Sequence, residues 1–336
     1  MASRILVVKT SSLGDVVHAL AAVNDAVAAG FEVDWVVEEG FADIPRAQPG
    51  VSRVIEVAWR RWRRNLTSSR GEMLNFYREL RIEDYDLVLD SQGLVKSSVI
   101  SLLARGSTAG FSHTSAREPW GAFLYRYRHR VPKGGHAIDR QRALFGKALG
   151  YPVSEAWQTG IERPRTLSNQ IFLLHGTTWV TKHWPEPMWV DLIGRYLEAG
   201  QEPLVTWGDE SERVRAQRLV DAGATMIERR PIRELMDLLA GCALVVGVDS
   251  GLGHLAAALG VPTVGLYGAT SGELTGSRGQ TAAFIQGETA CSPCVRKQCR
   301  AYRGPGLSWQ GEAVFPPCFA SVTPQRVFAT TRNWLA

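Results

Sequence analysis

Cysteine and long apolar runs are both scarce in this chain. Five cysteines among 336 residues are too few for a disulfide-stabilised secreted scaffold. The first apolar run, residues 5–8, is followed at once by Lys9 and is too short for the core of a secretory signal. No segment approaches the roughly 18 uninterrupted apolar residues of a membrane-spanning helix. We therefore expect a soluble, cytoplasmic protein.

The remaining composition, 45% hydrophobic and 21% charged, is that of a globular protein with a sizeable core. At about 150 residues per domain, the length favours two domains or one large one. The net charge of +5 lies entirely in the first half, where residues 1–150 hold 21 basic and 16 acidic side chains. This asymmetry favours an anionic partner, such as nucleic acid, a phospholipid surface or an acidic small molecule; the alternative is a mildly basic, solvated surface.

Apolar runs alternate with segments of helical periodicity along the whole chain. In the first half we predict strands at 4–9, 32–37, 53–57 and 86–90 and helices at 15–29, 71–81 and 93–104. Residues 150–170 have the composition of a linker. Beyond it we predict strands at 171–174, 203–207, 244–248 and 263–267 and helices at 187–199, 210–222, 231–240 and 252–259. Such repetition indicates parallel sheets wrapped by helices on both faces.

These elements predict an α/β protein of two similar halves that face each other across a hinge. We place an N-terminal domain at residues 1–160 and a C-terminal domain at 161–322. The last helical stretch, within 323–336, can pack on either half, the N-terminal domain included. Ligands of open α/β sheets bind beyond the carboxyl ends of the strands, so the loops after the strands are the candidate sites.

The loop after the first strand places Asp15 at the start of a helix. Asp15 is either an N-terminal cap or a carboxylate directed at the space between the halves, where it would serve as a general base for an alcohol. A carboxylate can take the proton of an alcohol only when that alcohol displaces an activated leaving group. The opposite half of the chain would have to bind this leaving group.

The loop after residues 171–174 suits such a leaving group. The hydroxyls of Thr177 and Thr178 and the ammonium group of Lys182 match the oxygens of a diphosphate. Such residues also occur in loops that bind nothing.

A second loop of this half, Asp249-Ser250-Gly251, joins a strand to a helix, and amides at such a junction form an anion site. His254 either adds a donor to the bound phosphate or packs and caps locally.

The same junction reads Gly-x-Gly-x-x-Ala, so a nicotinamide oxidoreductase is the alternative enzyme class. The next strand ends at Tyr267 without the carboxylate that would bind a ribose in that class. Residues 207–212 supply carboxylates instead, and these either bind a ribose diol or are solvated acids at a helix start.

Arginine is concentrated in the first half, at positions 60, 61, 63, 64 and 117 and in the run 126–130, with Lys96 beside them. Arginine forks pair with carboxylates and phosphates, so this half suits a polyanionic substrate. Nucleic acid is an alternative because aromatic residues interleave with the arginines, but a net charge of +5 argues against an extended nucleic-acid surface.

Four cysteines fall within 28 residues: Cys291, Cys294, Cys299 and Cys318. Four thiolates could hold structural zinc or iron. Their spacing matches no standard zinc finger, so reduced, unligated thiols are the favoured alternative.

Five segments together resemble one known family, the ADP-heptose:lipopolysaccharide heptosyltransferases of glycosyltransferase family 9, and within it the heptosyltransferase I proteins. The segments are residues 9–18 (KTSSLGDVVH), 35–41 (WVVEEGF), 90–97 (DSQGLVKS), 182–186 (KHWPE) and 248–255 (VDSGLGHL). They span both halves in the order found in that family.

The resemblance implies a GT-B fold, with two Rossmann-like domains facing a central cleft. It implies an inverting, metal-independent transfer of L-glycero-D-manno-heptose from ADP-heptose to the inner Kdo of Kdo2-lipid A, with Asp15 as the general base and no cofactor. On the donor side it implies Thr177, Thr178 and Lys182 for the ADP phosphates, Glu212 for the ribose, Asp249 for the heptose hydroxyls, and Ser250, Gly251 and His254 for the diphosphate and sugar. For the carboxylates and phosphates of the acceptor it implies Arg60, Arg61, Arg63, Lys96 and Arg117.

The chain departs from that pattern at Ser250, where threonine is expected, and at Gly253, where serine is expected. The cysteine segment is more similar to heptosyltransferase II, so that activity, or a related ADP-heptose transferase with another acceptor, is an alternative. A non-catalytic module that binds sugar or lipopolysaccharide is a further alternative.

We expect peripheral, electrostatic association with the anionic inner face of the cell inner membrane, weakened by salt.

Overall fold

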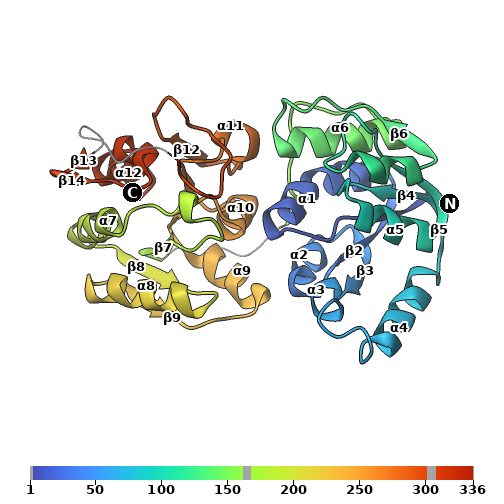
Figure 1. The fold of residues 1–336 in the computed structure, drawn as a ribbon, viewed down its shortest axis with the longest axis horizontal. Helices are drawn as coiled ribbons and strands as arrows, with labels where there is room; N and C mark the ends of the chain where they lie inside the picture. Colours follow the sequence, from blue (N-terminus) through green and yellow to red (C-terminus); the bar gives the residue numbers. More distant parts are fainter. Residues whose placement is uncertain (1–2, 162–167, 301–307, 336) are drawn as a thin grey trace. The chain divides into compact units, whose positions relative to one another are not determined.

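The structure is a computed structural model that describes residues 3–161, 168–300 and 308–335. The chain divides into two compact units, residues 1–162 and 163–336. Each unit has its own six-stranded sheet, in which all neighbouring strands are parallel (Figure 1). The two doubly wound α/β units predicted from the sequence are therefore confirmed.

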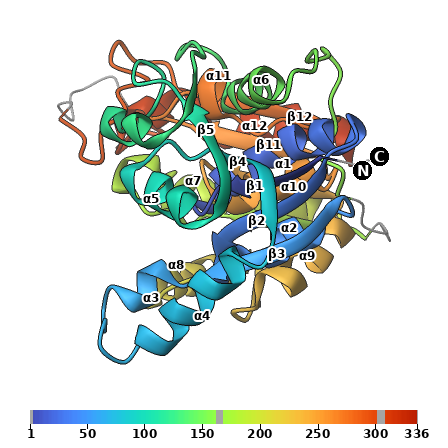
Figure 2. The same cartoon turned by 90° about the vertical axis from the view of Figure 1, so that its right-hand side faces the viewer.

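The sheet of the first unit has the strand order β3-β2-β1-β4-β5-β6. Its strands are β1 (Arg4–Val8), β2 (Glu32–Glu38), β3 (Val51–Val57), β4 (Asp84–Asp90), β5 (Arg105–Phe111) and β6 (Tyr127–His129). Its helices are α1 (Leu13–Ala28), α2 (Asp43–Arg46), α3 (Trp59–Trp62), α4 (Arg70–Leu80), α5 (Val95–Leu103) and α6 (Ala137–Leu149), with 3-10 turns η1 (Glu39–Phe41) and η2 (Pro119–Leu124). Figure 2 faces this unit. Residues 5–8 of β1 are wholly buried, as a central strand covered on both faces requires.

The sheet of the second unit has the order β12-β11-β10-β7-β8-β9. Its strands are β7 (Gln170–Leu174), β8 (Glu202–Thr206), β9 (Thr225–Ile227), β10 (Leu244–Val248), β11 (Thr263–Tyr267) and β12 (Ala282–Gln286), and β13 (Ser308–Trp309) and β14 (Glu312–Ala313) form a separate hairpin. Its helices are α7 (Glu186–Glu198), α8 (Glu210–Asp221), α9 (Ile232–Gly241), α10 (Gly251–Ala258), α11 (Gly272–Thr275) and α12 (Pro324–Thr331), with 3-10 turns η3 (Val180–Lys182), η4 (Pro317–Ser321) and η5 (Arg332–Trp334).

In each sheet, the next two strands along the chain are added on one side of the first strand, and the later strands are added on its other side. In the first sheet β1 lies between β2 and β4, and in the second β7 lies between β8 and β10. The loops at the carboxyl ends of two such strands diverge to opposite faces of the sheet and leave a crevice that binds ligands. The loops after β1 and β4, and those after β7 and β10, therefore lie where each unit is built to bind a ligand.

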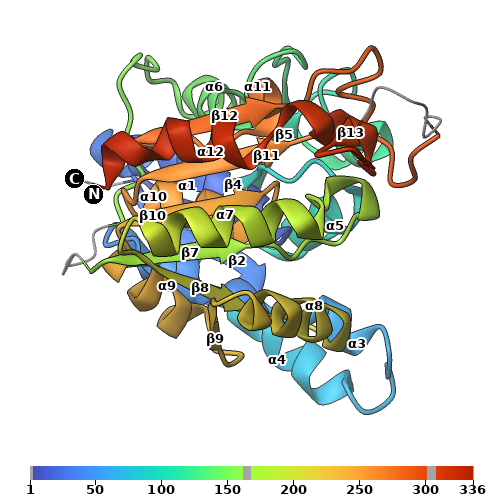
Figure 3. The same cartoon turned by 90° about the vertical axis from the view of Figure 1, so that its left-hand side faces the viewer.

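The helix at the end of the chain packs on α7, within the second unit (Figure 3). The hydroxyls of Tyr196 and Thr331 lie 2.8 Å apart, and the rings of Tyr196 and Phe328 lie 5.5 Å apart. The sequence left the choice between the two halves open, and the amphipathic face of α12 is used here against α7.

No helix in the part of the chain that the structure describes has both the length and the apolar character needed to cross a membrane.

Candidate functional site

In the first unit, the loops after β1 and β4 are held together by one side chain. The Gln92 carbonyl oxygen accepts from the backbone amides of Thr10 and Ser11 at 3.0 and 3.2 Å, and its amide nitrogen donates to the Ser11 carbonyl. Buried Lys9 adds a bond of 3.1 Å from Nζ to the Ser91 carbonyl. These bonds fix the short loop that leads into α1.

Asp15 lies in the first turn of α1, where its Oδ2 accepts from both the amide and the hydroxyl of Ser12 at 2.9 Å. The predicted alternative of Asp15 as the N-cap is wrong in detail, because Ser12 is the N-cap of α1 and Asp15 is the third helical residue, whose carboxylate caps the Ser12 amide. Both bonds use one oxygen, and no hydrogen bond to Oδ1 is found among the described residues. Burial acts to raise the pKa of the Asp15 carboxyl, but the charge of Lys9 and the two Ser12 bonds outweigh it and hold that pKa below its usual range. Asp15 is therefore ionised at neutral pH, the form that a general base requires.

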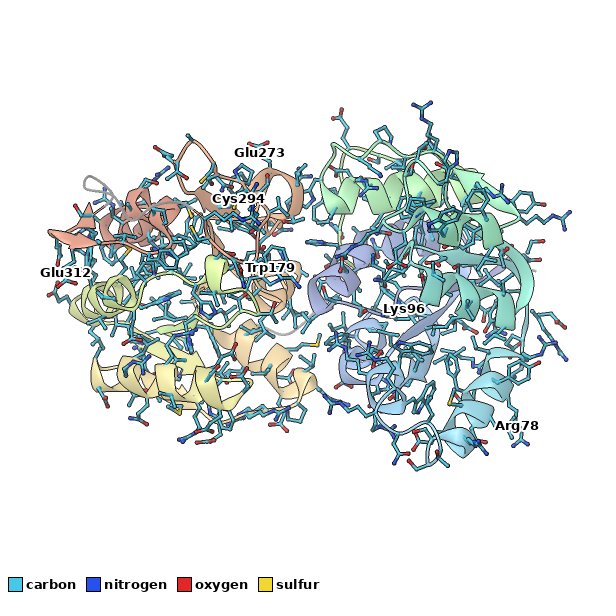
Figure 4. All side chains as sticks on the ribbon, viewed as in Figure 1. Arg78, Lys96, Trp179, Glu273, Cys294 and Glu312 are labelled. Atoms are coloured by element: carbon cyan, nitrogen blue, oxygen red, sulfur yellow. The ribbon has the colours of Figure 1, made fainter. Side chains whose placement is uncertain are left out.

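Two of the predicted acceptor-binding cations, Arg117 and Lys96, lie near the loop that holds this carboxylate. Arg117 is close enough to lower the pKa of Asp15. Lys96 on α5, which is labelled in Figure 4, donates to the Ser11 hydroxyl at 3.3 Å. Burial and the charges of Arg60 and Arg63 lower the pKa of Lys96, against the opposing effect of Glu38. The structure thus gathers Lys96, Arg60 and Arg63 into one basic group, with Arg117 on the side of Asp15.

Arg61 differs from the other predicted acceptor-binding cations because its guanidinium group is already paired with two carboxylates. Its guanidinium forms two bonds with Glu39, of 3.2 and 2.9 Å, and a third of 2.8 Å with Glu72. Glu72 also accepts from the indole of Trp62. These contacts give Arg61 a role in holding α3 to η1 and α4, so an acceptor must displace carboxylates to reach it.

In the second unit, Lys182 and Asp249 join the loops after β7 and β10. The Lys182 ammonium lies 2.8 Å from Oδ2 of Asp249, and the same oxygen accepts from the Thr270 hydroxyl at 2.7 Å. His254 Nε2 lies 3.6 Å from the other oxygen. Although burial acts to raise it, the hydrogen bond from His254 and the charge of Lys182 hold the pKa of the Asp249 carboxyl far below its usual range. The carboxylate therefore fixes the position of the ammonium group.

Helix α10 begins at Gly251, two residues after Asp249. The backbone amides of its amino end therefore lie next to the loop that carries Asp249. Ser250 is its N-cap and accepts from the Gly253 amide at 3.5 Å, and Gly251 is its first residue. Thr177 donates to the Asp249 carbonyl at 3.1 Å, and Thr178 next to it is exposed. An ammonium group, two hydroxyls and a helix amino end together match the charge and the acceptors of a diphosphate.

Glu212, on α8, lies over the ends of β7 and β8. Its Oε2 accepts from the Gly208 amide at 2.8 Å. A methyl group at Gly176 would stand 2.5 Å from its Oε1, so only glycine leaves room for the carboxylate at that position. The Glu212 carboxylate is thereby fixed at the edge of the sheet on which Lys182 lies.

The four clustered cysteines, Cys291, Cys294, Cys299 and Cys318, line one small cavity of the second unit, together with Thr181 and Pro317. All four are free thiols, Cys291 being exposed and Cys318 buried. Burial and the negative charge of the other three raise the pKa of the Cys318 thiol to about 12. Within the described ranges, no three Cys, His, Asp or Glu side chains form a group that could hold a metal ion.

The sequence motifs contained several positioning residues that were not singled out. Gln92 and Lys9 lie within two of the quoted segments, and Thr270 follows β11. The signal for Gln92 was its place directly after a buried strand, where a polar side chain commonly holds a neighbouring loop. No local pattern indicated Thr270, because its partner is 21 residues away.

Comparisons with known proteins agree with this geometry. A family model described as glycosyltransferase family 9 (heptosyltransferase) matches residues 73–303. The chain is 43% identical to lipopolysaccharide heptosyltransferase 1 of Pseudomonas aeruginosa, over 96% of each chain. Its fold is similar to that of E. coli heptosyltransferase WaaC with ADP (TM-score 0.79, 40% identity, 84% of this chain and 92% of that one). It is also similar to E. coli heptosyltransferase WaaC with ADP-2-deoxy-2-fluoro heptose (TM-score 0.77, 37% identity, 87% of this chain and 97% of that one).

Proposed function

The chain belongs to glycosyltransferase family 9, the heptosyltransferases, and from this premise we propose that it is a heptosyltransferase I. It transfers L-glycero-D-manno-heptose from ADP-heptose to the inner Kdo of Kdo2-lipid A in the synthesis of the lipopolysaccharide core. The observation that carries the proposal is the nearly full-length relation to a protein named lipopolysaccharide heptosyltransferase 1. That relation favours glycosyl transfer over the nicotinamide chemistry that the glycine pattern at 251–253 left open.

The proposed reaction is a single in-line displacement that inverts the anomeric carbon. A Kdo hydroxyl oxygen forms the new bond to that carbon, the bond to the ADP oxygen breaks, and ADP leaves with the electron pair. The hydroxyl proton passes to Asp15. A carboxylate with a depressed pKa is a weak base, so the proton moves only as the attacking oxygen becomes acidic late in bond formation.

The donor-binding groups act on the leaving group. Lys182 and the amino end of α10 offset the charge that develops on the β-phosphate, with Thr178 and Ser250 as further donors; Thr177 donates to the phosphate only after releasing the Asp249 carbonyl. His254 and Gly251 complete the diphosphate and sugar site. Because a fixed ammonium group supplies this positive charge, the proposed transfer is metal-independent. Asp249, which holds Lys182, contributes its remaining acceptor capacity to the heptose hydroxyls.

The acceptor is polyanionic, and the basic group of Arg60, Arg63 and Lys96, with Arg117, suits its carboxylates and phosphates. Arg61 takes part only after exchanging Glu39 or Glu72 for an acceptor oxygen.

Because the acceptor is a lipid, we propose that the protein works in the cytoplasm, peripherally associated with the inner face of the inner membrane.

The experiment that tests this function compares two acceptors. With ADP-heptose as donor, mass analysis is expected to show one added heptose on Kdo2-lipid A and none on Kdo2-lipid A that already carries a heptose. Addition to the second acceptor alone would assign the chain to heptosyltransferase II. No addition to either acceptor would contradict heptose transfer.

Glu212 is proposed to bind the ribose hydroxyls, and Gly176 gives a test that leaves Glu212 itself unchanged. Gly176→Ala places a methyl group 2.5 Å from Oε1 and displaces the carboxylate. Loss of hydrogen bonds to a charged group is expected to raise the KM for ADP-heptose about tenfold or more, with a smaller change in kcat. Steady-state kinetics at saturating acceptor measures both constants.

The matched control is Gly194→Ala on α7, where an added methyl group meets no atom within 4 Å. This variant is expected to keep the wild-type KM. An unchanged KM in Gly176→Ala would remove the assignment of Glu212 to the ribose.

A further inference from the structure

Helix α5 has an apolar outer face and a partly polar inner face, the reverse of the pattern expected for a helix that borders water. Three serines are buried and each donates its hydroxyl to a carbonyl three or four residues earlier: Ser97, Ser98 and Ser101. Four large apolar side chains are exposed at helical spacing: Val95, Val99, Leu102 and Leu103. The serines are satisfied within the helix, but in water the apolar face has nothing to pack against.

The turn η2 places two aromatic side chains beside this helix. It packs directly on α5, because a methyl group at Gly121 would stand 3.1 Å from the Leu94 carbonyl carbon and the Ser98 hydroxyl. Trp120 is 77% exposed and Phe123 is 57% exposed, with their rings 6.0 Å apart. We call the exposed side chains of the two elements the α5–η2 surface: Val95, Val99, Leu102, Leu103, Trp120 and Phe123. Figure 2 faces the unit that carries it.

The α5–η2 surface lies in the most basic part of the chain. Residues 91–138 contain seven Lys and Arg and one acidic residue, Glu118. The Glu118 carboxylate accepts from the Val95 amide at 2.8 Å and caps α5. Arg128 lies over the Phe123 ring at 5.8 Å, and Arg81 bonds to the Leu103 carbonyl at 3.0 Å. Cationic side chains thus border the apolar surface at the aromatic turn and at the far end of α5.

We infer that the α5–η2 surface docks on a lipid bilayer that contains anionic phospholipids. Exposed apolar patches of this kind mark interaction sites. Tryptophan and phenylalanine partition into the interfacial region of a bilayer, where the aliphatic side chains of α5 also leave water. The bordering guanidinium groups then reach phosphate headgroups of opposite charge. The charged groups bordering the surface are mainly cationic, Glu118 at the start of α5 being the exception, and this excess of positive charge matches anionic headgroups.

This inference rests on the peripheral membrane association in the proposed function and names the surface that makes the contact; none of the six side chains is assigned to the base, the donor or the acceptor. It also changes the expected character of membrane binding. Purely electrostatic association is lost as salt rises, whereas contact between apolar side chains and lipid is not screened. The α5–η2 surface therefore predicts a fraction of binding that persists at high salt.

The test is sedimentation with vesicles of phosphatidylcholine, with and without phosphatidylglycerol, and without any acceptor lipid. The wild-type protein is expected to bind the anionic vesicles and to retain part of this binding at high salt. The double variant Trp120→Ala/Phe123→Ala is expected to bind about tenfold or more weakly and to lose the salt-resistant fraction. A second variant, Val99→Gln/Leu102→Gln on α5, is expected to show the same loss.

The matched control is Val190→Ser/Val214→Ser, which removes two similarly exposed apolar side chains from α7 and α8 of the second unit. It is expected to bind vesicles as the wild type does. Wild-type binding by both α5–η2 variants would overturn the inference. So would a dimer, seen by sedimentation velocity, that these variants dissociate, because a second copy of the chain would then cover the surface. Because the vesicles contain no acceptor, failure here is distinguishable from failure of the proposed reaction.

Discussion

Asp15→Ala is expected to lower kcat for heptose transfer by a factor of about 10² to 10⁴, the usual contribution of a positioned general base. The affinity for ADP is expected to stay close to that of the wild type, because the proposed donor contacts come from the second unit. The physical reason is that Oδ2 of Asp15 is held by Ser12, which leaves Oδ1 as the oxygen that would accept the Kdo proton in the proposed reaction. Turnover is measured by ADP release, and ADP affinity by calorimetry.

Loss of the cap is the competing explanation, because Asp15 also stabilises the first turn of α1. Asp15→Asn separates the two roles, since its amide oxygen can still accept from Ser12 but is not a useful base. Thr323→Ala is the control for cap loss alone: it removes the N-cap of α12, whose hydroxyl accepts from the Arg326 amide at 3.2 Å. Such a loss costs about 1 kcal/mol of stability. Thr323→Ala is expected to lower Tm without lowering kcat, and near wild-type turnover in Asp15→Asn would rule out the base.

Lys182→Met is expected to lower kcat/KM for ADP-heptose by a factor of about 10² to 10³, since it removes the fixed positive charge opposite the leaving group. The affinity for ADP is expected to fall while that for adenosine, which has no diphosphate, changes little. This difference follows from the position of the ammonium group, 2.8 Å from Asp249 at the amino end of α10. Calorimetric titration with both ligands measures it.

Arg233→Met is the matched control, since it removes an exposed cation from α9 of the same unit. It is expected to bind both ligands as the wild type does. If Lys182→Met loses the same factor in affinity for adenosine and for ADP, then Lys182 supports the shape of the loop and does not neutralise the diphosphate.

The sequence predicted the strands that consist mostly of apolar residues. It missed strands that are made of small residues or of a mixture of polar and apolar ones. Strands β10 (Leu-Val-Val-Gly-Val) and β11 (Thr-Val-Gly-Leu-Tyr) have the predicted bounds because they are short, mostly apolar segments. Strand β5, by contrast, reads Arg-Gly-Ser-Thr-Ala-Gly-Phe. Its Gly110 is small because Tyr125 packs against it, where a methyl group would stand 2.5 Å from the ring. Such a contact depends on a residue that is distant in sequence, so periodicity cannot indicate it.

The candidate site could be predicted as a set of loops but not as a set of contacts. The pair formed by Lys182 and Asp249 follows from two strands that are adjacent in the sheet yet 67 residues apart at those side chains. The ionic partners of Arg61 lie 22 and 11 residues away, on η1 and α4. For α5, the helix was predicted, but the burial of its serines depends on how it packs against the sheet. Residue type therefore indicated the chemistry, and tertiary packing decided which groups remain accessible.

The most direct test of the proposed displacement is the anomeric configuration of the product. The glycan formed by the wild-type protein from ADP-heptose and Kdo2-lipid A would be isolated, and the new heptose–Kdo linkage determined by NMR. The account predicts a single heptose on the inner Kdo, with a configuration opposite to that of the donor. A linkage that keeps the donor configuration would contradict a one-step transfer assisted by Asp15.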